Sequence, residues 1–497
     1  MGVLDVLKNV KFGQRVAEEE GDLLSAYFVE TDHWTRLLSG EVDIVYGSKG
    51  SGKSALYSLL IARRDELFDR STLLAPAENP RGSPAFKALV SDPPASEGEF
   101  FALWKIYLAC LISASLEEHG ITSAPALELR RLLEQHDLLP RQKNLQGTLE
   151  AVFCYVKRLL RASSFEGGIK LDPCTQMPSE ISAKIILTEP TQGQMKRGFV
   201  SAEQLLRLGD QALTASGYHL WLLLDRLDVA FSESAALEQS ALRALFRIYL
   251  DLRELYAVSL KIFLRTDIWR RITTTGFREA SHITRHLTIG WNSGSLMNLI
   301  VRRAVQNEDL LARYAITKEE VLGSLNSQRA FFYRLFPDQV DVGPSKPDTF
   351  DWMMTRTRDG SKQSAPRELI HLLNSLRDVQ VRKLEVGDSE PNEGRLFSRA
   401  AFKEALPEVS STRLEQTLYA EYPDIREPIE RLRGEKTQYS IGSLAELWRV
   451  DAEEALRRAR MLVEVGFFEQ RGDRQSPAFW VPFLYRDALD LVQGTAE

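Results

Sequence analysis

The sequence predicts an α/β fold, in which a parallel β-sheet is covered by helices on both faces and a largely helical C-terminal half follows. Apolar runs long enough for buried strands, among them residues 219–224 and 259–264, alternate with helical segments up to about residue 290. A glycine-rich segment, residues 47–54, joins the first apolar run to a helix. Together these patterns indicate a doubly wound sheet with a ligand-binding loop after its first strand.

The expected strands follow from apolar runs that end at proline, aspartate or polar residues. The predicted helix after 219–224 covers about 234–253, where alanine and leucine are frequent. The expected strands are 42–46, 71–76, 219–224, 259–264 and 282–289.

A helical insertion of about residues 97–200 is expected, because the interval between the glycine-rich loop and strand 219–224 exceeds one βαβ crossover. Helical periodicity covers 97–163, and short strands or a hairpin are expected at 169–172 and 181–188. Ser201 and Gln204 form a capping box that opens a helix ending at Gly217.

The predicted organisation has four parts, with a linker at Pro391-Asn392-Glu393-Gly394. They are residues 1–40, a helical segment packing on the core; 41–290, the core with its insertion; 291–390, a helical lid; and 395–497, a winged-helix-like domain.

Composition excludes several classes of protein. The net charge of −6 and pI of about 5.9 provide no overall positive field for nucleic acid or acidic membranes. Three cysteines without a C-x-x-C pair argue against structural zinc or a disulfide framework, and for a reducing cytoplasm. The most apolar window, 100–116, contains Lys105 and is too short for a membrane span, so we expect a buried helix and no membrane association.

The loop after the first strand matches the Walker A pattern G-x-x-x-x-G-K-[ST] with both flanks correct. Glycines let consecutive backbone N–H groups point inward around a polyphosphate at a helix N-terminus. We expect Lys53 to reach the β- and γ-phosphates of ATP and Ser54 to hold Mg²⁺. The expected nucleotide-binding residues are Gly47, Ser48, Lys49, Gly50, Ser51, Gly52, Lys53, Ser54 and Ala55.

A carboxylate at the end of strand 219–224 completes the predicted metal site. Asp225 is interpreted as the Walker B aspartate that binds Mg²⁺, and a capping aspartate is the alternative. Arg226 follows where many hydrolytic relatives have glutamate, and its guanidinium cannot act as a base. Asp228 is the nearest group to activate water, with an N-cap role as an equal alternative.

Two further positions are predicted to sense the γ-phosphate. Arg265, Thr266 and Asp267 follow strand 259–264 at the carboxyl edge of the sheet, where Thr266 is expected to face the attacking water. The alternative is an ordinary turn capped by Asp267. Arg367 follows a helix-initiating proline and is expected to reach the nucleotide from the lid, unless it is an exposed helix-face arginine.

The C-terminal pattern of helix, turn, helix and two strands predicts a winged helix over about 438–482. Its second helix carries Arg457, Arg458 and Arg460, which are candidates for phosphate contacts. Acidic residues outnumber basic ones from residue 430 onward, whereas DNA-binding domains usually have a basic excess. We therefore favour a protein-packing or regulatory role over DNA readout.

Taken together, these motifs resemble a bacterial family of P-loop ATPases related to the AAA+, STAND and KAP groups, over roughly residues 10–375. The residues that carry the resemblance are Phe12-Gly13, Glu18-Glu19-Glu20, 27–31, 50–55, 224–228 and 263–269. The resemblance implies a P-loop NTPase with an AAA+/STAND-like parallel sheet. It also implies a cytoplasmic nucleotide-driven switch, often encoded near phage-defence genes.

Three functions are compatible with these predictions. The first is an ATPase switch, with slow hydrolysis, that closes its lid near Arg367 and controls a protein partner or self-assembly. The second is a DNA-associated ATPase resembling origin-recognition or transposition regulators, which would use the winged helix on DNA. The third keeps ATP as a structural ligand that is never hydrolysed.

Overall fold

The structure is a computed structural model that describes residues 2–77, 96–139, 144–163, 185–186, 200–227, 234–274, 276–473 and 476–496. The chain divides into two compact units, which are described separately below. The sheet unit comprises Asp32–Gly47 and Lys53–Thr288, and the helical unit comprises Met1–Thr31, Ser48–Gly52 and Ile289–Glu497.

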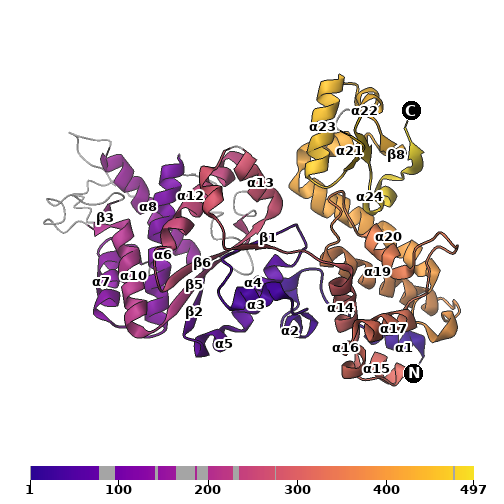
Figure 1. Cartoon of the computed structure of the whole chain (residues 1–497), viewed down its shortest axis with the longest axis horizontal. Coiled ribbons are helices and arrows are strands. Elements are labelled where there is room, and N and C mark those ends of the chain that lie inside the picture. The colour runs from indigo at the N-terminus through magenta and orange to yellow at the C-terminus, as the bar shows by residue number, and fades with distance from the viewer. Residues whose placement is uncertain are drawn as a thin grey trace. The chain divides into compact units, whose positions relative to one another are not determined.

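The sheet unit contains a five-stranded sheet with the order β2-β5-β6-β1-β7 (Figure 1). Every pairing in this sheet is parallel. The strands are β1 (Ile44–Gly47), β2 (Thr72–Pro76), β5 (His219–Leu224), β6 (Val258–Arg265) and β7 (His286–Thr288). Thus β6 lies between β1, which leads into the glycine-rich loop, and β5, which leads to Asp225.

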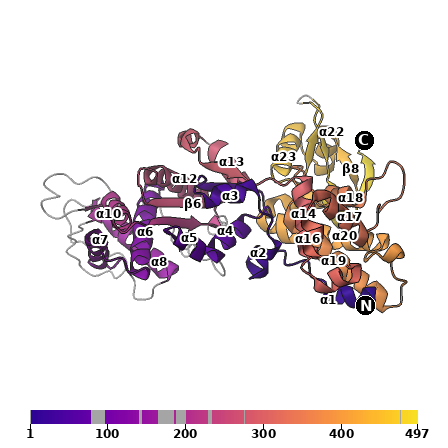
Figure 2. The ribbon, with the colours of Figure 1, turned by 60° about the horizontal axis from the view of Figure 1, so that its bottom comes forward.

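Helices cover both faces of this sheet, which explains why its central strands are almost continuously apolar. Helices α12 (Ala235–Leu252) and α13 (Thr266–Thr274) lie on one face, and α4 (Lys53–Ala62) and α5 (Arg64–Asp69) on the other (Figure 2). The apolar residues 220–224 of β5 are all buried. The doubly wound prediction is confirmed.

The predicted helical insertion is present. It contains α6 (Glu97–Glu118), α7 (Ala124–Glu134), α8 (Leu145–Ser163) and α10 (Ala202–Ser216). Ser201 and Gln204 form the predicted capping box of α10, and Gly217 ends that helix with a φ of 73°. A short strand β3 (Ile185–Ile186) pairs in parallel with β4 (Val200–Ser201). The expected strand at 169–172 lies outside the described residues.

Helix α6 packs against α8, α10 and α12. It is the one helix in the described ranges that has the length and apolar composition of a membrane span, but 83% of that apolar window is buried within the protein. The prediction of a buried helix is confirmed. Cys110 of α6 is a free thiol.

In the helical unit, the N-terminal helices pack against helices from the second half of the chain. Helices α1 (Val3–Asn9) and α2 (Leu23–Tyr27) pack with α14 (Ser293–Ala304), α15 (Glu308–Tyr314) and α19 (Pro366–Glu385). The further helices of this part are α16 (Lys318–Leu322), α17 (Leu325–Leu335), α18 (Thr349–Arg356) and α20 (Arg399–Arg413).

The C-terminal part of the helical unit has the predicted winged-helix pattern. Two helices, α22 (Ile441–Trp448) and α23 (Ala452–Glu464), precede the antiparallel wing strands β9 (Glu469–Arg471) and β10 (Ala478–Trp480). The remaining elements are α21 (Arg426–Glu430), β8 (Lys436–Tyr439), α24 (Phe483–Arg486) and β11 (Val492–Thr495), and the sheet order is β11-β8-β10-β9.

One expected strand is shorter in the structure. The strand predicted at 282–289 is limited to β7; a 3-10 helix covers Arg278–His282, and residues 283–285 are in neither a helix nor a strand. In the N-terminal segment, Val3, Val6 and Leu7 belong to the hydrophobic cluster of the helical unit. Helices α19 and α20, on either side of residues 391–394, pack together.

Candidate nucleotide-binding site

The glycine-rich loop has the backbone that its sequence predicts. Strand β1 ends at Gly47 and α4 begins at Lys53. Gly50 and Gly52 have φ angles of 76° and 102°, a region that L side chains rarely adopt. The Lys53 Nζ donates a hydrogen bond to the Gly47 carbonyl oxygen at 3.0 Å, so the ammonium group folds back over the loop. Ala55 follows in the first turn of α4.

The two predicted metal ligands are in contact within the sheet unit. Ser54 Oγ donates a hydrogen bond to Asp225 Oδ2 at 2.8 Å. Asp225 is only 4% exposed and follows directly after β5. A hydroxyl and a carboxylate held side by side at the start of α4 are hard oxygen ligands of the kind that fit Mg²⁺. The residues present therefore match the predicted ATP and Mg²⁺ chemistry.

Thr266 follows the end of a third strand, β6. In the sheet register Arg265 pairs with Gly47, so Thr266 follows at the same edge as the glycine-rich loop. Thr266 is the first residue of α13. Arg265 donates two hydrogen bonds to Asp267, Nε to Oδ1 at 3.1 Å and Nη2 to Oδ2 at 2.9 Å. This bidentate pair occupies Arg265 and leaves Thr266 as the better candidate for contact with a substrate water.

The middle of the glycine-rich loop contacts three elements of the helical unit. Lys49 forms an ion pair with Glu421. Trp291 Nε1 donates a hydrogen bond to the Ser51 carbonyl oxygen at 2.8 Å. A Cβ built at Gly50 would lie 2.9 Å from the Cβ of Arg367. Any side chain at Gly50 would therefore push the loop away from the first turn of α19.

Arg367 lies at the start of α19, next to Gly50 of the glycine-rich loop. It is the second residue of α19, after Pro366. Its Nε is buried and has no hydrogen-bond partner among the described residues. The Oγ of Ser51 is likewise buried without a partner there. Burial lowers the pKa of the Arg367 guanidinium, while the neighbouring Glu368 carboxylate acts in the opposite direction. Unpartnered buried donors next to a phosphate loop fit an anionic ligand.

The structure thus brings most of the predicted site residues into two groups. Within the sheet unit these are Gly47, Lys53, Ser54, Ala55, Asp225 and Thr266; within the helical unit they are Ser48, Lys49, Gly50, Ser51, Gly52 and Arg367. Asp228 lies outside the described residues. Arg226 has a φ of 59°, an uncommon conformation for a residue with a side chain. Sequence reasoning did not identify Trp291 or Glu421, since neither belongs to a local motif.

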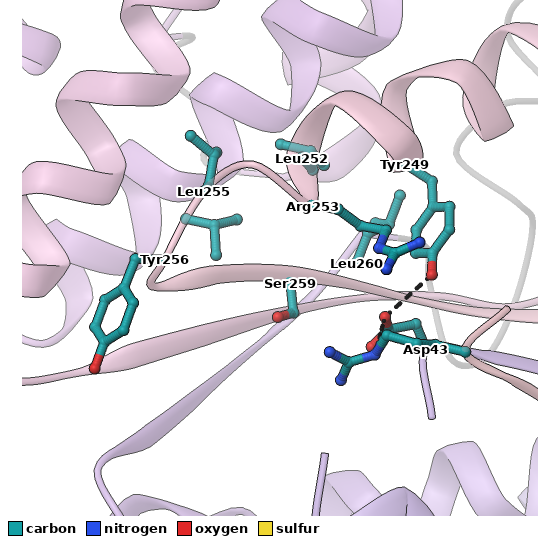
Figure 3. A pocket seen from close by; sticks show the side chains of 10 residues that line it. Asp43, Tyr249, Leu252, Arg253, Leu255, Tyr256, Ser259 and Leu260 are labelled. Carbon is teal, nitrogen blue, oxygen red and sulfur yellow. Dashed lines mark hydrogen bonds and ion pairs between the residues drawn. The ribbon is translucent and has the colours of Figure 1, made fainter. Parts of the chain in front are cut away.

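A separate pocket of about 180 Å³ lies at the opposite end of the strands (Figure 3). Asp43 accepts hydrogen bonds from Tyr249 Oη at 3.1 Å and Lys261 Nζ at 2.8 Å, and Arg285 forms an ion pair with it at 2.9 Å. Burial lowers the pKa of Lys261, and the Asp43 charge opposes this shift. Because these contacts tie β1 to β6 and to the chain before β7, we assign the cluster a structural role.

The arginines of the winged helix are largely neutralised. Arg457 donates two hydrogen bonds to Glu454, at 2.6 and 2.7 Å, and Arg458 donates a third at 2.8 Å. These bonds lower the pKa of Glu454 to about 2. Arg460 is exposed, next to a groove that also contains Asp451 and three glutamates of α23. The predicted phosphate-contacting face therefore has little net positive charge.

Comparisons with known proteins identify similar solved structures only. No protein-family model matches the chain, and no curated protein matches it. The ORC1 protein of Aeropyrum pernix in complex with DNA is 13% identical, with a TM-score of 0.38 and coverage of 96% of each chain. The ORC2 protein of the same organism, in ADPNP and ADP complexes, is 13% identical over 97% of this chain and 96% of that chain, with a TM-score of 0.40. Cdc6p of Pyrobaculum aerophilum is 11% identical, with a TM-score of 0.30 and coverage of 94% and 96%.

The fold is assigned on the elements of the chain itself. The strand of the glycine-rich loop and the strand of Asp225 flank β6 in a parallel sheet. A helical region and a winged helix follow. The chain therefore has a parallel α/β core of the P-loop NTPase kind, with a helical insertion and a C-terminal winged helix.

Proposed function

We propose that this protein binds ATP with Mg²⁺ and hydrolyses it slowly, as a nucleotide-driven conformational switch. The observation that carries the proposal is the 2.8 Å contact between Ser54 and Asp225 at the start of the phosphate-binding helix. Lys53 would contact the β- and γ-phosphates, Ser54 and Asp225 would hold Mg²⁺, and Thr266 would orient the attacking water. Asp228 remains the candidate group to activate that water.

The contacts of the glycine-rich loop support a conformational response to nucleotide binding. Residues 49–51 contact Glu421, Arg367 and Trp291, which come from three separate parts of the helical unit. Phosphate groups would compete with Glu421 for Lys49 and would attract Arg367, because both side chains are cationic. Nucleotide binding would therefore change how the helical unit contacts this loop.

Slow hydrolysis is supported by the residue after Asp225. Arg226 offers a guanidinium, which has no acceptor for a proton from water, where a carboxylate would serve as base. The reaction would then depend on positioning by Thr266 and on charge stabilisation by Lys53 and Mg²⁺. This arrangement suits a protein whose bound state lasts long enough to control a partner or self-assembly in the cytoplasm.

The experiment that tests the proposal compares wild type with Lys53→Ala. We expect wild type to hydrolyse ATP and Lys53→Ala to lose hydrolysis and most of its ATP affinity. Equal hydrolysis by both proteins would contradict the enzyme assignment. Binding to wild type without any hydrolysis above the Lys53→Ala background would instead support ATP as a structural ligand.

The second candidate function is a DNA-associated ATPase. The feature that supports it is the winged helix. Arg457 and Arg458 both pair with Glu454, and Asp451, Glu453 and Glu464 lie on the same face, so we place this function behind the switch. Binding to DNA that weakens steeply with salt would favour it, because displaced counterions make such affinity salt-dependent. The proposed anti-phage role comes from the family resemblance alone, and a neighbouring nuclease or membrane effector gene would support it.

A further inference from the structure

A buried carboxylate connects the glycine-rich loop to α20. Glu368 is 4% exposed. Its Oε2 has no hydrogen-bond partner in the described part of the chain and lies 3.5 Å from the position of a Cβ built at Gly50. Its Oε1 accepts a hydrogen bond from Arg413 Nη1 at 2.8 Å. Because Arg413 is itself 8% exposed, little water is present to screen this ion pair.

Arg413 has a second acidic neighbour, from the segment between α18 and α19. Its Nη2 lies 3.5 Å from Asp359 Oδ2. Burial raises the pKa of the Asp359 carboxyl, and the charge of Arg413 acts against that rise. Asp359 Oδ1 accepts hydrogen bonds from the backbone N and the Oγ of Ser361, at 3.0 and 2.6 Å. One guanidinium thus joins the carboxylate beside the loop to a second carboxylate.

Asp359 in turn lies against the chain that leads into the wing. A Cβ built at Gly466 would lie 3.1 Å from Asp359 Oδ2. The Gly360 N–H donates to the Gly466 carbonyl oxygen at 2.7 Å, and a Cβ built at Gly360 would lie 2.2 Å from the Phe468 carbonyl oxygen. Only glycine permits so close an approach of two backbones. Movement of Asp359 would therefore reach the residues immediately before β9.

We propose that Arg413 is a positioning residue that couples occupancy of the glycine-rich loop to the wing, through Glu368 on one side and Asp359 on the other. The proposal rests on the nucleotide-binding function proposed above. The contacts that link the glycine-rich loop, Glu368, Arg413 and Asp359 all lie within the helical unit. When phosphate draws on Lys49 and Arg367, the start of α19 shifts, Glu368 moves with it, and Arg413 transfers the change to Asp359 and the wing.

The experiment measures amide hydrogen exchange of the full chain with and without ATP and Mg²⁺. In wild type we expect ATP to change the exchange rate of residues 466–471 by about fivefold or more, the lower end of typical coupling between sites. Arg413→Lys keeps the charge but not the forked geometry, so it should reduce this change to less than about twofold. The matched control is Arg303→Lys, which alters another buried pair of the helical unit, Arg303 with Glu20 at 2.6 Å.

The outcomes separate the proposed role of Arg413 from the proposed nucleotide-binding function. A full wing response in Arg413→Lys, or an equal loss of response in Arg303→Lys, would overturn the role of Arg413. A wild type that binds ATP without any wing response would overturn it as well. Loss of ATP binding in Lys53→Ala, with binding retained in Arg413→Lys, would show that the nucleotide site is present whatever Arg413 does.

A second measurement tests the same connection without nucleotide. Gly466→Ala places a methyl group against Asp359 in a backbone with a φ of 77°. We expect exchange of residues 49–52 to rise by about threefold or more. Gly434→Ala is the matched control, since Gly434 has a φ of 78° and open surroundings. The same exchange at 49–52 in both variants would refute the connection.

Discussion

Replacing Gly50 with alanine tests whether the glycine-rich loop is held against α19. Gly50 has a φ of 76°, and the added methyl group would lie 2.9 Å from the Cβ of Arg367 and 3.5 Å from that of Ala365. Ordinary contacts between carbon atoms are about 3.5–4.0 Å long. The loop and the first turn of α19 must therefore separate by about 0.6 Å for the new side chain to fit.

Two free-energy costs add in the Gly50→Ala variant. An alanine in the left-handed region costs about 1–2 kcal/mol relative to glycine. Inserting a methyl group into a filled contact costs about 1–3 kcal/mol more. Gly434→Ala has the first cost without the second, because Gly434 has nearly the same φ and no atom within 4 Å of its added Cβ. The difference between the two variants therefore isolates the contact with Arg367.

The assay compares thermal midpoints and ATP dissociation constants for wild type, Gly50→Ala and Gly434→Ala. Both variants should lower the midpoint, by roughly 2–4 °C for each kcal/mol lost in units of this size. Gly50→Ala alone should also weaken ATP binding, by roughly 5- to 150-fold if its extra 1–3 kcal/mol distorts the phosphate cradle. If the two variants matched each other in stability and left ATP affinity unchanged, the loop would not be held by α19.

Three further predictions concern separate features. Asp225→Asn should reduce Mg²⁺-dependent hydrolysis about 100-fold while changing ATP affinity much less, and equal losses in steady-state rates and in binding titrations would argue against the metal assignment. Burial, and then the charge of Arg15, lowers the pKa of His371 from 6.5 to about 4. Because the unfolded chain binds this proton more readily, the stability from a neutral His371 is complete above pH 6.5. On the order of 3 kcal/mol is lost as pH falls to 4, and denaturant titrations of His371→Gln should lack this dependence. Arg460→Ala and Arg457→Ala should leave the salt dependence of any DNA binding unchanged in filter-binding assays, and a smaller slope in either variant would support phosphate contacts.

Local sequence patterns were sufficient to predict the structure wherever a few consecutive residues determine it. The capping box of Ser201 and Gln204, and the glycine C-cap at Gly217, depend on neighbours three or four residues away and were confirmed. The glycine-rich loop is equally local. Its meeting with Asp225 was predictable because parallel strands bring their carboxyl ends to one edge. The roles of Asp228 and Thr266 in catalysis remain predictions.

Packing between distant segments was not predictable in this way. The N-terminal helix α1 is as apolar on one face as a helix that covers a sheet, and nothing in its sequence distinguishes α19 as its neighbour. Residues 391–394 are turn-forming, and α19 and α20 on either side of them pack together; the domain linker expected there stays a prediction. Turn composition marks where the chain bends, whereas a domain boundary depends on which surfaces then meet.

By itself, the sequence determined the kind of ligand site: a phosphate loop, a metal-binding aspartate and a sheet to hold them, because each depends on residue type and short spacing. Only the tertiary structure decided what the loop touches. Lys49 meets Glu421 across more than 370 positions, and Glu368 meets Arg413 across 45. Such contacts depend on how the helices pack, and ion pairs between distant positions leave no local pattern. The ligand was therefore predictable from residues 47–54, and the proposed route from that ligand to the wing was not.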